Sequence, residues 1–211
     1  MKLFLTSSCI SENLREPFLK FLEKDPRNIM CYFIPTAIDV EEEAMKWTVK
    51  SMDDLASVGL NVIWYALRFK TKEQVASELA DADLIWVNGG NTFHLLEVAR
   101  STGFLEVVDS LVREDGVMYG GVSAGTIIAN PTIESASWED HGADENLTNM
   151  TDLTGLGFID AFTHVHYNPE FEREIVKKKT QGKILYAIPD GAAVEVNGAE
   201  VILHGDIEVF E

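Results

Sequence analysis

Short apolar runs recur along the first 120 residues of this chain, and helical patterns separate them. The runs occupy residues 3–5, 29–34, 61–65, 84–87 and 117–119. Between them, apolar residues stand three or four positions apart, as Leu14, Phe18 and Phe21 do, which is the spacing of a helix with one buried face. Alternating strands and helices favour a parallel sheet, because parallel neighbours need a long crossover connection. We therefore predict an α/β fold: a three-layer sandwich with a mainly parallel sheet between helices.

The predicted elements are specific enough to place the motifs. Helices are expected at residues 14–22, 39–58, 93–100 and 105–113, with a short helix capped by Thr71 and Gln74. After residue 180 the pattern changes to short strands at 184–188, 192–196, 201–203 and 207–210. The dipeptides Asp190-Gly191, Asn197-Gly198 and Gly205-Asp206 separate these strands and are typical of hairpin turns. We expect antiparallel strands at the C-terminal edge of the sheet, and residues 1–211 as a single domain.

The charge balance excludes two classes of partner. The chain has 35 acidic residues against 17 Lys and Arg, a formal net charge of −18. Nucleic-acid binding and docking on an anionic membrane both need clustered basic residues, so we expect neither. Two cysteines make no disulfide framework, and no run approaches the roughly 18 apolar residues that span a bilayer. We predict a cytoplasmic protein.

The strongest chemical signal is the segment Gly121-Val122-Ser123-Ala124-Gly125. It has the form G-x-S-x-G between a predicted strand and a predicted helix, the context of a nucleophile elbow. The turn is tight, so its glycines leave room for neighbouring backbone. Ser123 is the candidate nucleophile, and the N–H of Ala124 is a candidate donor to an oxyanion.

A second loop carries polar groups to the same edge of the sheet. Gly89-Gly90-Asn91 follows the strand predicted at 84–87, and ligands of such sheets bind beyond the carboxyl ends of the strands. The N–H of Gly90 or Asn91 is the candidate second oxyanion donor. Asn91 also fits a helix-capping role, which is compatible with the first.

A serine nucleophile requires a base, and the chain has five histidines. His164 and His166 stand two apart, so in an extended segment both point to one face. His166 is the favoured base because Tyr167-Asn168-Pro169 ends its strand there, and His164 is the rival. The pair lacks the partners of a metal site, so we expect no metal.

The base in turn needs an orienting carboxylate. Asp190 follows the strand predicted at 184–188, which places it at the end of a strand, as His166 is. Glu139 and Asp140, in a long polar loop, are the alternatives, and they would give the chain order Ser–Asp–His.

Together these motifs resemble the peptidase E family, the S51 serine peptidases, which include aspartyl dipeptidases and, more distantly, cyanophycinases. The resemblance runs over almost the whole chain. It implies a fold like that of class I glutamine amidotransferases, with serine in place of cysteine. It also implies Ser123 as nucleophile, His166 as base, Asp190 as third member and no cofactor, with Gly90 and Ala124 as oxyanion donors. The matching segments are Gly89-Gly90-Asn91-Thr92-Phe93, Gly121-Val122-Ser123-Ala124-Gly125, Pro131-Thr132-Ile133, Val165-His166-Tyr167 and Ile188-Pro189-Asp190-Gly191.

The expected function is hydrolysis of small peptides, as a dipeptidase with Asp-X among the candidate substrates. The alternatives are an esterase or acyltransferase with the same triad, and a non-catalytic homologue that binds a small ligand. A homodimer remains an option.

The chain differs from the aspartyl dipeptidases of the family in the residues expected to bind the substrate. Aspartyl dipeptidases of the family carry an Arg-rich helical stretch beyond the histidine, whereas here Arg173 is the only Arg in that region. Arg173 and Asn91 are the candidate substrate-binding residues. Residues 134–174 contain ten acidic residues and one basic residue. If they rim the site, they disfavour anionic substrates.

Overall fold

A seven-stranded sheet forms the centre of the protein. The computed structural model describes residues 1–138, 142–178 and 182–211. The strand order is β3-β2-β4-β5-β1-β8-β9, in which the first five are parallel, β8 runs antiparallel to β1, and β9 antiparallel to β8. The predicted mainly parallel sheet with antiparallel strands at its edge is confirmed. The bounds are β1 Lys2–Thr6, β2 Met30–Ile34, β3 Asn61–Trp64, β4 Leu84–Val87, β5 Met118–Val122, β8 Ala193–Asn197 and β9 Glu200–His204.

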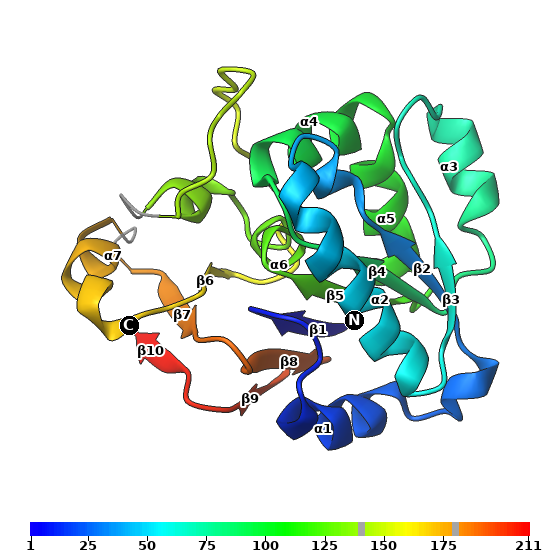
Figure 1. Cartoon of the computed structure of the whole chain (residues 1–211), viewed down its shortest axis with the longest axis horizontal. Coiled ribbons are helices and arrows are strands. Elements are labelled where there is room, and N and C mark those ends of the chain that lie inside the picture. The colour runs from blue at the N-terminus through cyan, green and yellow to red at the C-terminus, as the bar shows by residue number, and fades with distance from the viewer. Residues whose placement is uncertain (139–141, 179–181) are drawn as a thin grey trace.

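Helices cover both faces of this sheet, as the alternation of side chains along its strands requires (Figure 1). In β1, Leu3 and Leu5 belong to one core cluster and Phe4 to the other. The cluster around Phe4 includes apolar residues of α1 (Glu12–Leu22) and α2 (Met45–Ser57). The opposite cluster includes those of α3 (Lys72–Glu78), α4 (Thr92–Ser101), α5 (Phe104–Arg113) and α6 (Ala124–Ile127). The three layers are thus confirmed.

The segment before α2 differs from the prediction. Instead of one helix over 39–58, it forms the 3-10 turns Thr36–Ile38 and Glu42–Ala44 before α2 begins. The first of these turns packs on the loop after β4, where the Asn91 N–H donates to the Ala37 carbonyl at 2.9 Å. The helix predicted from residue 39 therefore begins only at Met45, after the 3-10 turn Glu42–Ala44.

A second sheet of three strands lies beside the first. It has the order β10-β7-β6, from β6 (Ala161–Val165), β7 (Ile184–Ile188) and β10 (Glu208–Phe210). β6 and β7 are parallel, and β10 is antiparallel to β7. The prediction that 184–188 and 207–210 join the edge of the main sheet is therefore wrong. Only Asn197-Gly198 is a hairpin turn, because the chain changes sheets at Asp190-Gly191 and at Gly205-Asp206.

The small sheet has its own apolar packing. Ile175 of α7 (Glu172–Lys178) packs with Trp138, Phe162 and Leu185 in a separate buried cluster. Figure 1 shows α7 with β6, β7 and β10 on the side of the molecule away from β3. No helix in the described part of the chain is long and apolar enough to cross a membrane.

One buried side chain links the two sheets. Asn130, which follows α6, is fully buried and accepts from the N–H and the hydroxyl of Thr163 in β6, both at 3.0 Å. Its amide nitrogen donates to the Thr163 carbonyl at 3.3 Å. The side-chain amide thus satisfies both backbone groups of Thr163, as a neighbouring strand would.

Candidate active site

The nucleophile elbow forms where β5 meets α6. Ser123 stands between them at φ 51° and ψ −111°, a strained conformation for a residue with a side chain. The flanking glycines are needed for space. A Cβ on Gly121 would lie 2.5 Å from the Gly125 carbonyl oxygen, and one on Gly125 would lie 2.0 Å from the Val87 oxygen. The motif therefore folds as its G-x-S-x-G pattern predicts.

Hydrogen bonds from the neighbouring strands hold the elbow. The Ser123 N–H donates to the carbonyl of Thr6, the last residue of β1, at 3.1 Å. The buried Thr126 hydroxyl donates to the same carbonyl at 2.7 Å. On the other side, the Tyr119 hydroxyl donates to the Gly125 carbonyl at 2.6 Å. Both sides of the strained turn are therefore fixed to the main sheet.

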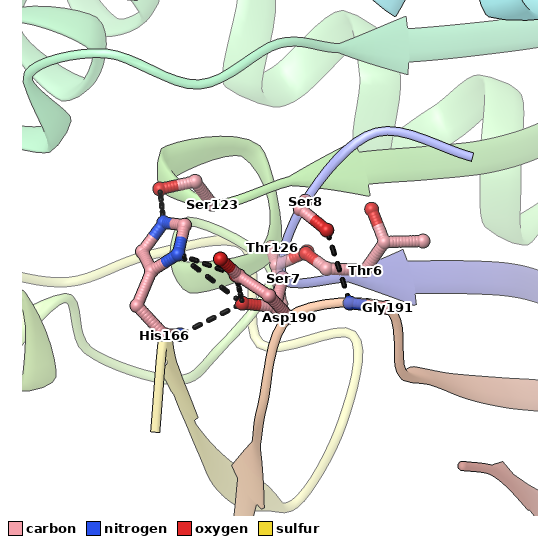
Figure 2. Close-up of polar contacts among 8 residues, drawn as sticks. All are labelled: Thr6, Ser7, Ser8, Ser123, Thr126, His166, Asp190 and Gly191. Atoms are coloured by element: carbon pink, nitrogen blue, oxygen red, sulfur yellow. Dashed lines mark hydrogen bonds and ion pairs between the residues drawn. The ribbon is translucent and has the colours of Figure 1, made fainter. Parts of the chain in front are cut away.

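The second sheet brings His166 and Asp190 to this elbow, as Figure 2 shows. His166 follows β6, and Asp190 follows β7 by two residues. His166 Nε2 lies 3.0 Å from Ser123 Oγ, and His166 Nδ1 lies 2.7 Å from Asp190 Oδ1. An ionised Asp190 accepts the Nδ1–H, which leaves Nε2 free to accept the serine proton. The three residues predicted from the sequence thus lie in one hydrogen-bonded line.

The electrostatics of the pair favour an ionised carboxylate. The hydrogen bond from His166 holds the pKa of Asp190 below its usual range, and the charge of His166 and a hydrogen bond from Ser7 act in the same direction. Asp190 is therefore an anion whenever His166 acts as a base near neutral pH.

The loop after β4 faces the nucleophile. A Cβ on Gly89 would lie 3.6 Å from Ser123 Oγ, so the loop is in contact with the elbow. Gly90 has φ +134°, and a Cβ there would lie 2.5 Å from the Ala37 carbonyl, so only glycine fits. Among the described residues, neither the Gly90 N–H nor the Ala124 N–H donates to an acceptor. The assignment of these two N–H groups as oxyanion donors stays a prediction.

The rival histidine is not part of this line. His164 is buried in β6 and stacks on Trp138, with ring centroids 6.1 Å apart. The expectation that His164 and His166 share one face does not apply, because His166 has left the strand with φ 55°. Glu139 and Asp140 lie outside the described residues.

The two predicted substrate-binding residues occupy different settings. Asn91 is buried, caps α4 by accepting from the His94 N–H at 2.9 Å, and donates to the Glu145 carbonyl at 3.0 Å. Its side chain therefore holds the Gly90 loop against the segment that follows residue 141. Arg173 is exposed on α7.

Two cavities flank the line of catalytic candidates. One, of about 340 Å³, is lined by Glu41, Trp47, Gly90 and Ser123 among others. The other, of about 320 Å³, lies on the far side of His166 and is lined by Asp144. Among the described residues, no Lys or Arg lines either cavity.

The pKa values of the two lining carboxylates are both raised. Partial burial raises the pKa of Glu41, and the charge of Asp144 raises it further. Partial burial likewise raises the pKa of Asp144, although its hydrogen bond from the Thr92 N–H at 2.7 Å opposes this. Within the described part of the chain, each cavity thus has an acidic side chain in its lining and no Lys or Arg.

Sequence reasoning missed one residue of this site. Ser7 follows β1, and its hydroxyl contacts both His166 and Asp190. Only the strand pairing could have indicated Ser7. Thr6 and Val122 are partners in neighbouring parallel strands, so Ser7 and Ser123, which follow them, lie side by side at the edge of the sheet.

Comparisons with known proteins extend over nearly the whole chain. The family model of peptidase family S51 matches residues 3–204. An uncharacterized peptidase of Listeria monocytogenes is 32% identical over 207 residues, covering 95% of this chain and 96% of that protein. A peptidase E of Salmonella newport is 32% identical over 182 residues, covering 82% of this chain and 75% of that protein.

Solved structures give the same result. A Listeria monocytogenes protein described as a candidate peptidase E has a TM-score of 0.80 at 30% identity, over 96% of both chains. A peptidase from an acI-B1 Actinobacterium shares the fold, with a TM-score of 0.64 at 19% identity over 99% of this chain and 96% of that one. The resemblance that the motifs predict is confirmed.

Proposed function

The chain belongs to peptidase family S51 and is a peptidase, and from this premise we propose that it cleaves short peptides through an acyl-enzyme on Ser123. The observation that carries the proposal is the line from Ser123 Oγ through His166 to Asp190, with contacts of 3.0 and 2.7 Å. A nucleophile, a base and an orienting anion at these distances are the parts that acyl transfer requires.

The reaction follows from these positions. His166 Nε2 takes the Ser123 proton while Oγ attacks the amide carbonyl carbon. The carbonyl oxygen becomes an oxyanion, for which the N–H groups of Gly90 and Ala124 are the donors. His166 then gives its proton to the leaving amine, and the C–N bond breaks. Water, activated by the same imidazole, hydrolyses the ester and regenerates Ser123.

The size and charge of the cavities bear on the substrate. Each holds only a few hundred Å³, which suits a residue or two on either side of the scissile bond. Glu41 and Asp144 line them, and no Lys or Arg of the described residues does, so a free α-amino group or a basic side chain gains attraction there and an acidic side chain does not. We therefore propose a dipeptidase for which Asp-X is a poor substrate.

A substrate panel with a serine variant tests the proposal. Dipeptides Ala-X, Lys-X and Asp-X, their N-acetylated forms and short-chain esters are incubated with wild-type protein, Ser123→Ala and the exposed control Ser77→Ala. We expect free Ala-X and Lys-X to be cleaved by wild type and by Ser77→Ala, with Ser123→Ala at background. Equal rates for Ser123→Ala and wild type would contradict a serine mechanism.

The other arms of the panel separate the remaining candidates. Cleavage of esters alone would favour an esterase or acyltransferase. Preferred cleavage of Asp-X would overturn the charge argument while leaving the Ser123 mechanism in place.

A further inference from the structure

The tripeptide Thr6-Ser7-Ser8 touches every loop that contributes to the catalytic line. Thr6 accepts from the Ser123 N–H at 3.1 Å through its carbonyl. The Ser8 hydroxyl accepts from the Gly191 N–H, next to Asp190, at 3.1 Å. Ser7, between them, lies against His166 and Asp190, as Figure 2 shows. One short turn thus meets the elbow from the main sheet and both loops from the small sheet.

The hydroxyl of Ser7 makes two hydrogen bonds of assigned direction, and it also lies 3.4 Å from His166 Nδ1. It donates to Asp190 Oδ1 at 2.9 Å, the same oxygen that accepts from His166 Nδ1. It accepts from the backbone N–H of His166 at 2.7 Å. Ser7 is fully buried, so water does not replace it in either bond.

The hydrogen bond from the His166 N–H to Ser7 replaces one that the small sheet does not provide. His166 has φ 55°, which breaks the regular pairing of β6 with β7. The Tyr167 N–H returns to the Ile188 carbonyl at 3.2 Å, and the His166 N–H turns to Ser7 instead. The strained backbone that aims the ring at Ser123 is therefore fixed by a side chain of the other sheet.

We propose that Ser7 is a positioning residue for the reaction, whose hydroxyl holds the Asp190 carboxylate and the His166 backbone in register with Ser123. The inference rests on the proposed function of these three residues. Ser7 does not contact the reacting atoms and acts through the pair.

The position of Ser7 also sets the proton affinity of that pair. A carboxylate with two donors shares its charge between them. Without Ser7, Asp190 becomes a stronger acceptor for the ring N–H alone, so the pair holds its proton to higher pH. A hydroxyl with a merely structural role would leave this titration unchanged.

The experiment compares Ser7→Ala and Ser7→Thr with wild type, using a dipeptide that Ser123→Ala fails to cleave. For Ser7→Ala we expect kcat to fall roughly 10- to 100-fold, with a smaller change in KM. The acid limb of the kcat/KM profile should move to higher pH by about half a unit or more. Ser7→Thr keeps the hydroxyl and should recover most of both.

Two controls isolate the effect. Thr102→Val removes a buried hydroxyl, which donates to Val98 at 2.7 Å within α4, and should leave kcat and the profile unchanged. Ser77→Ala removes an exposed hydroxyl on α3 and should leave the acid limb in place. Circular dichroism and thermal melts establish that each variant is folded.

The outcomes separate this inference from the proposed function. If Ser123→Ala abolishes cleavage while Ser7→Ala keeps the wild-type kcat and pH profile, only the role of Ser7 is overturned. If Ser123→Ala stays active, the proposed function fails. NMR titration of the His166–Asp190 pair then decides the role of Ser7 without any substrate, since an upward shift in Ser7→Ala supports it and an unchanged midpoint overturns it.

Discussion

Ser123 and His166, the proposed nucleophile and base, both have positive φ, at 51° and 55°. Residues other than glycine rarely adopt a positive φ, and each such residue costs of order 1–3 kcal/mol in conformational free energy. Both residues are held by hydrogen bonds to Thr6, the last residue of β1, and to Ser7, which follows it. These hydrogen bonds stabilise the two strained backbone conformations that the catalytic line requires.

Gly90 offers a test of the oxyanion loop. In Gly90→Ala the new Cβ would lie 2.5 Å from the Ala37 carbonyl, so the loop must move and its N–H leaves Ser123. We expect kcat to fall roughly 100- to 1,000-fold, the usual loss for one oxyanion donor. The control Gly116→Ala shares a positive φ but has nothing within 4 Å, and it should keep wild-type kcat. Equal activity of the two variants would exclude Gly90 as a donor.

Asp190 offers a test of the orienting anion. In Asp190→Asn the amide donates to His166 Nδ1, which leaves the proton on Nε2 and removes the base. We expect kcat to fall by about 10⁴-fold with the fold intact, as measured by initial rates and circular dichroism. The exposed neighbour Asp206→Asn serves as the control. A loss below tenfold would indicate that another carboxylate orients His166.

The sequence predicts this site unevenly, for physical reasons. The roles of Ser123 and Gly90 follow from local requirements, because an elbow and a tight loop need particular residues at fixed spacing. Ser7 belongs to no such local motif, since serine is common in the turns that follow strands. Its importance arises from contacts with residues 159 and 183 positions away, which no local pattern reports.

Turn dipeptides at the element scale show the same limit. Asp190-Gly191 and Asn197-Gly198 look alike as hairpin signals, yet only the second joins paired strands. A turn dipeptide specifies a local reversal and not the sheet that the next strand enters. The five parallel strands of the main sheet are predictable because their apolar runs alternate with helices. The division of the last four strands between two sheets depends on tertiary pairing.

Asn130 gives a prediction for the link between the two sheets. Asn130→Ala leaves the N–H of Thr163 without a partner in a fully buried position. We expect a loss of about 2–3 kcal/mol in the free energy of unfolding, or roughly 4–12 °C in Tm.

A neighbouring serine is the matched control for Asn130. Ser135→Ala removes only a 3.5 Å contact with Asn130 and should shift Tm by little. Equal melting temperatures for Asn130→Ala and wild type would show that the small sheet docks without this amide.

The charge of −18 acts at the scale of the whole molecule. Acidic residues far outnumber basic ones, so the folded state carries a net self-repulsion. Raising NaCl from about 10 mM to about 150 mM shortens the Debye length from roughly 30 Å to 8 Å. We expect Tm to rise by about 2–4 °C, equivalent to about 1 kcal/mol.

The same titration at a lower pH is its internal control. At about pH 4.5, close to the ordinary pKa of Asp and Glu, a sizeable fraction of the carboxylates is protonated, and the gain in Tm with salt should shrink. A fall in Tm with added NaCl at neutral pH would show that attractive ion pairs outweigh the repulsion.

The bonds between the two sheets also set an order of events during synthesis. Ser7 leaves the ribosome early, and its partner Asp190 follows 183 residues later. At about 5–20 residues per second, that interval lasts roughly 10–40 s. In the last part of this interval, after Ser123 has been translated, the nascent chain has the proposed nucleophile but no oriented base. The nascent chain therefore cannot assemble the proposed catalytic line, and cannot cleave peptides through it, until Asp190 has been translated.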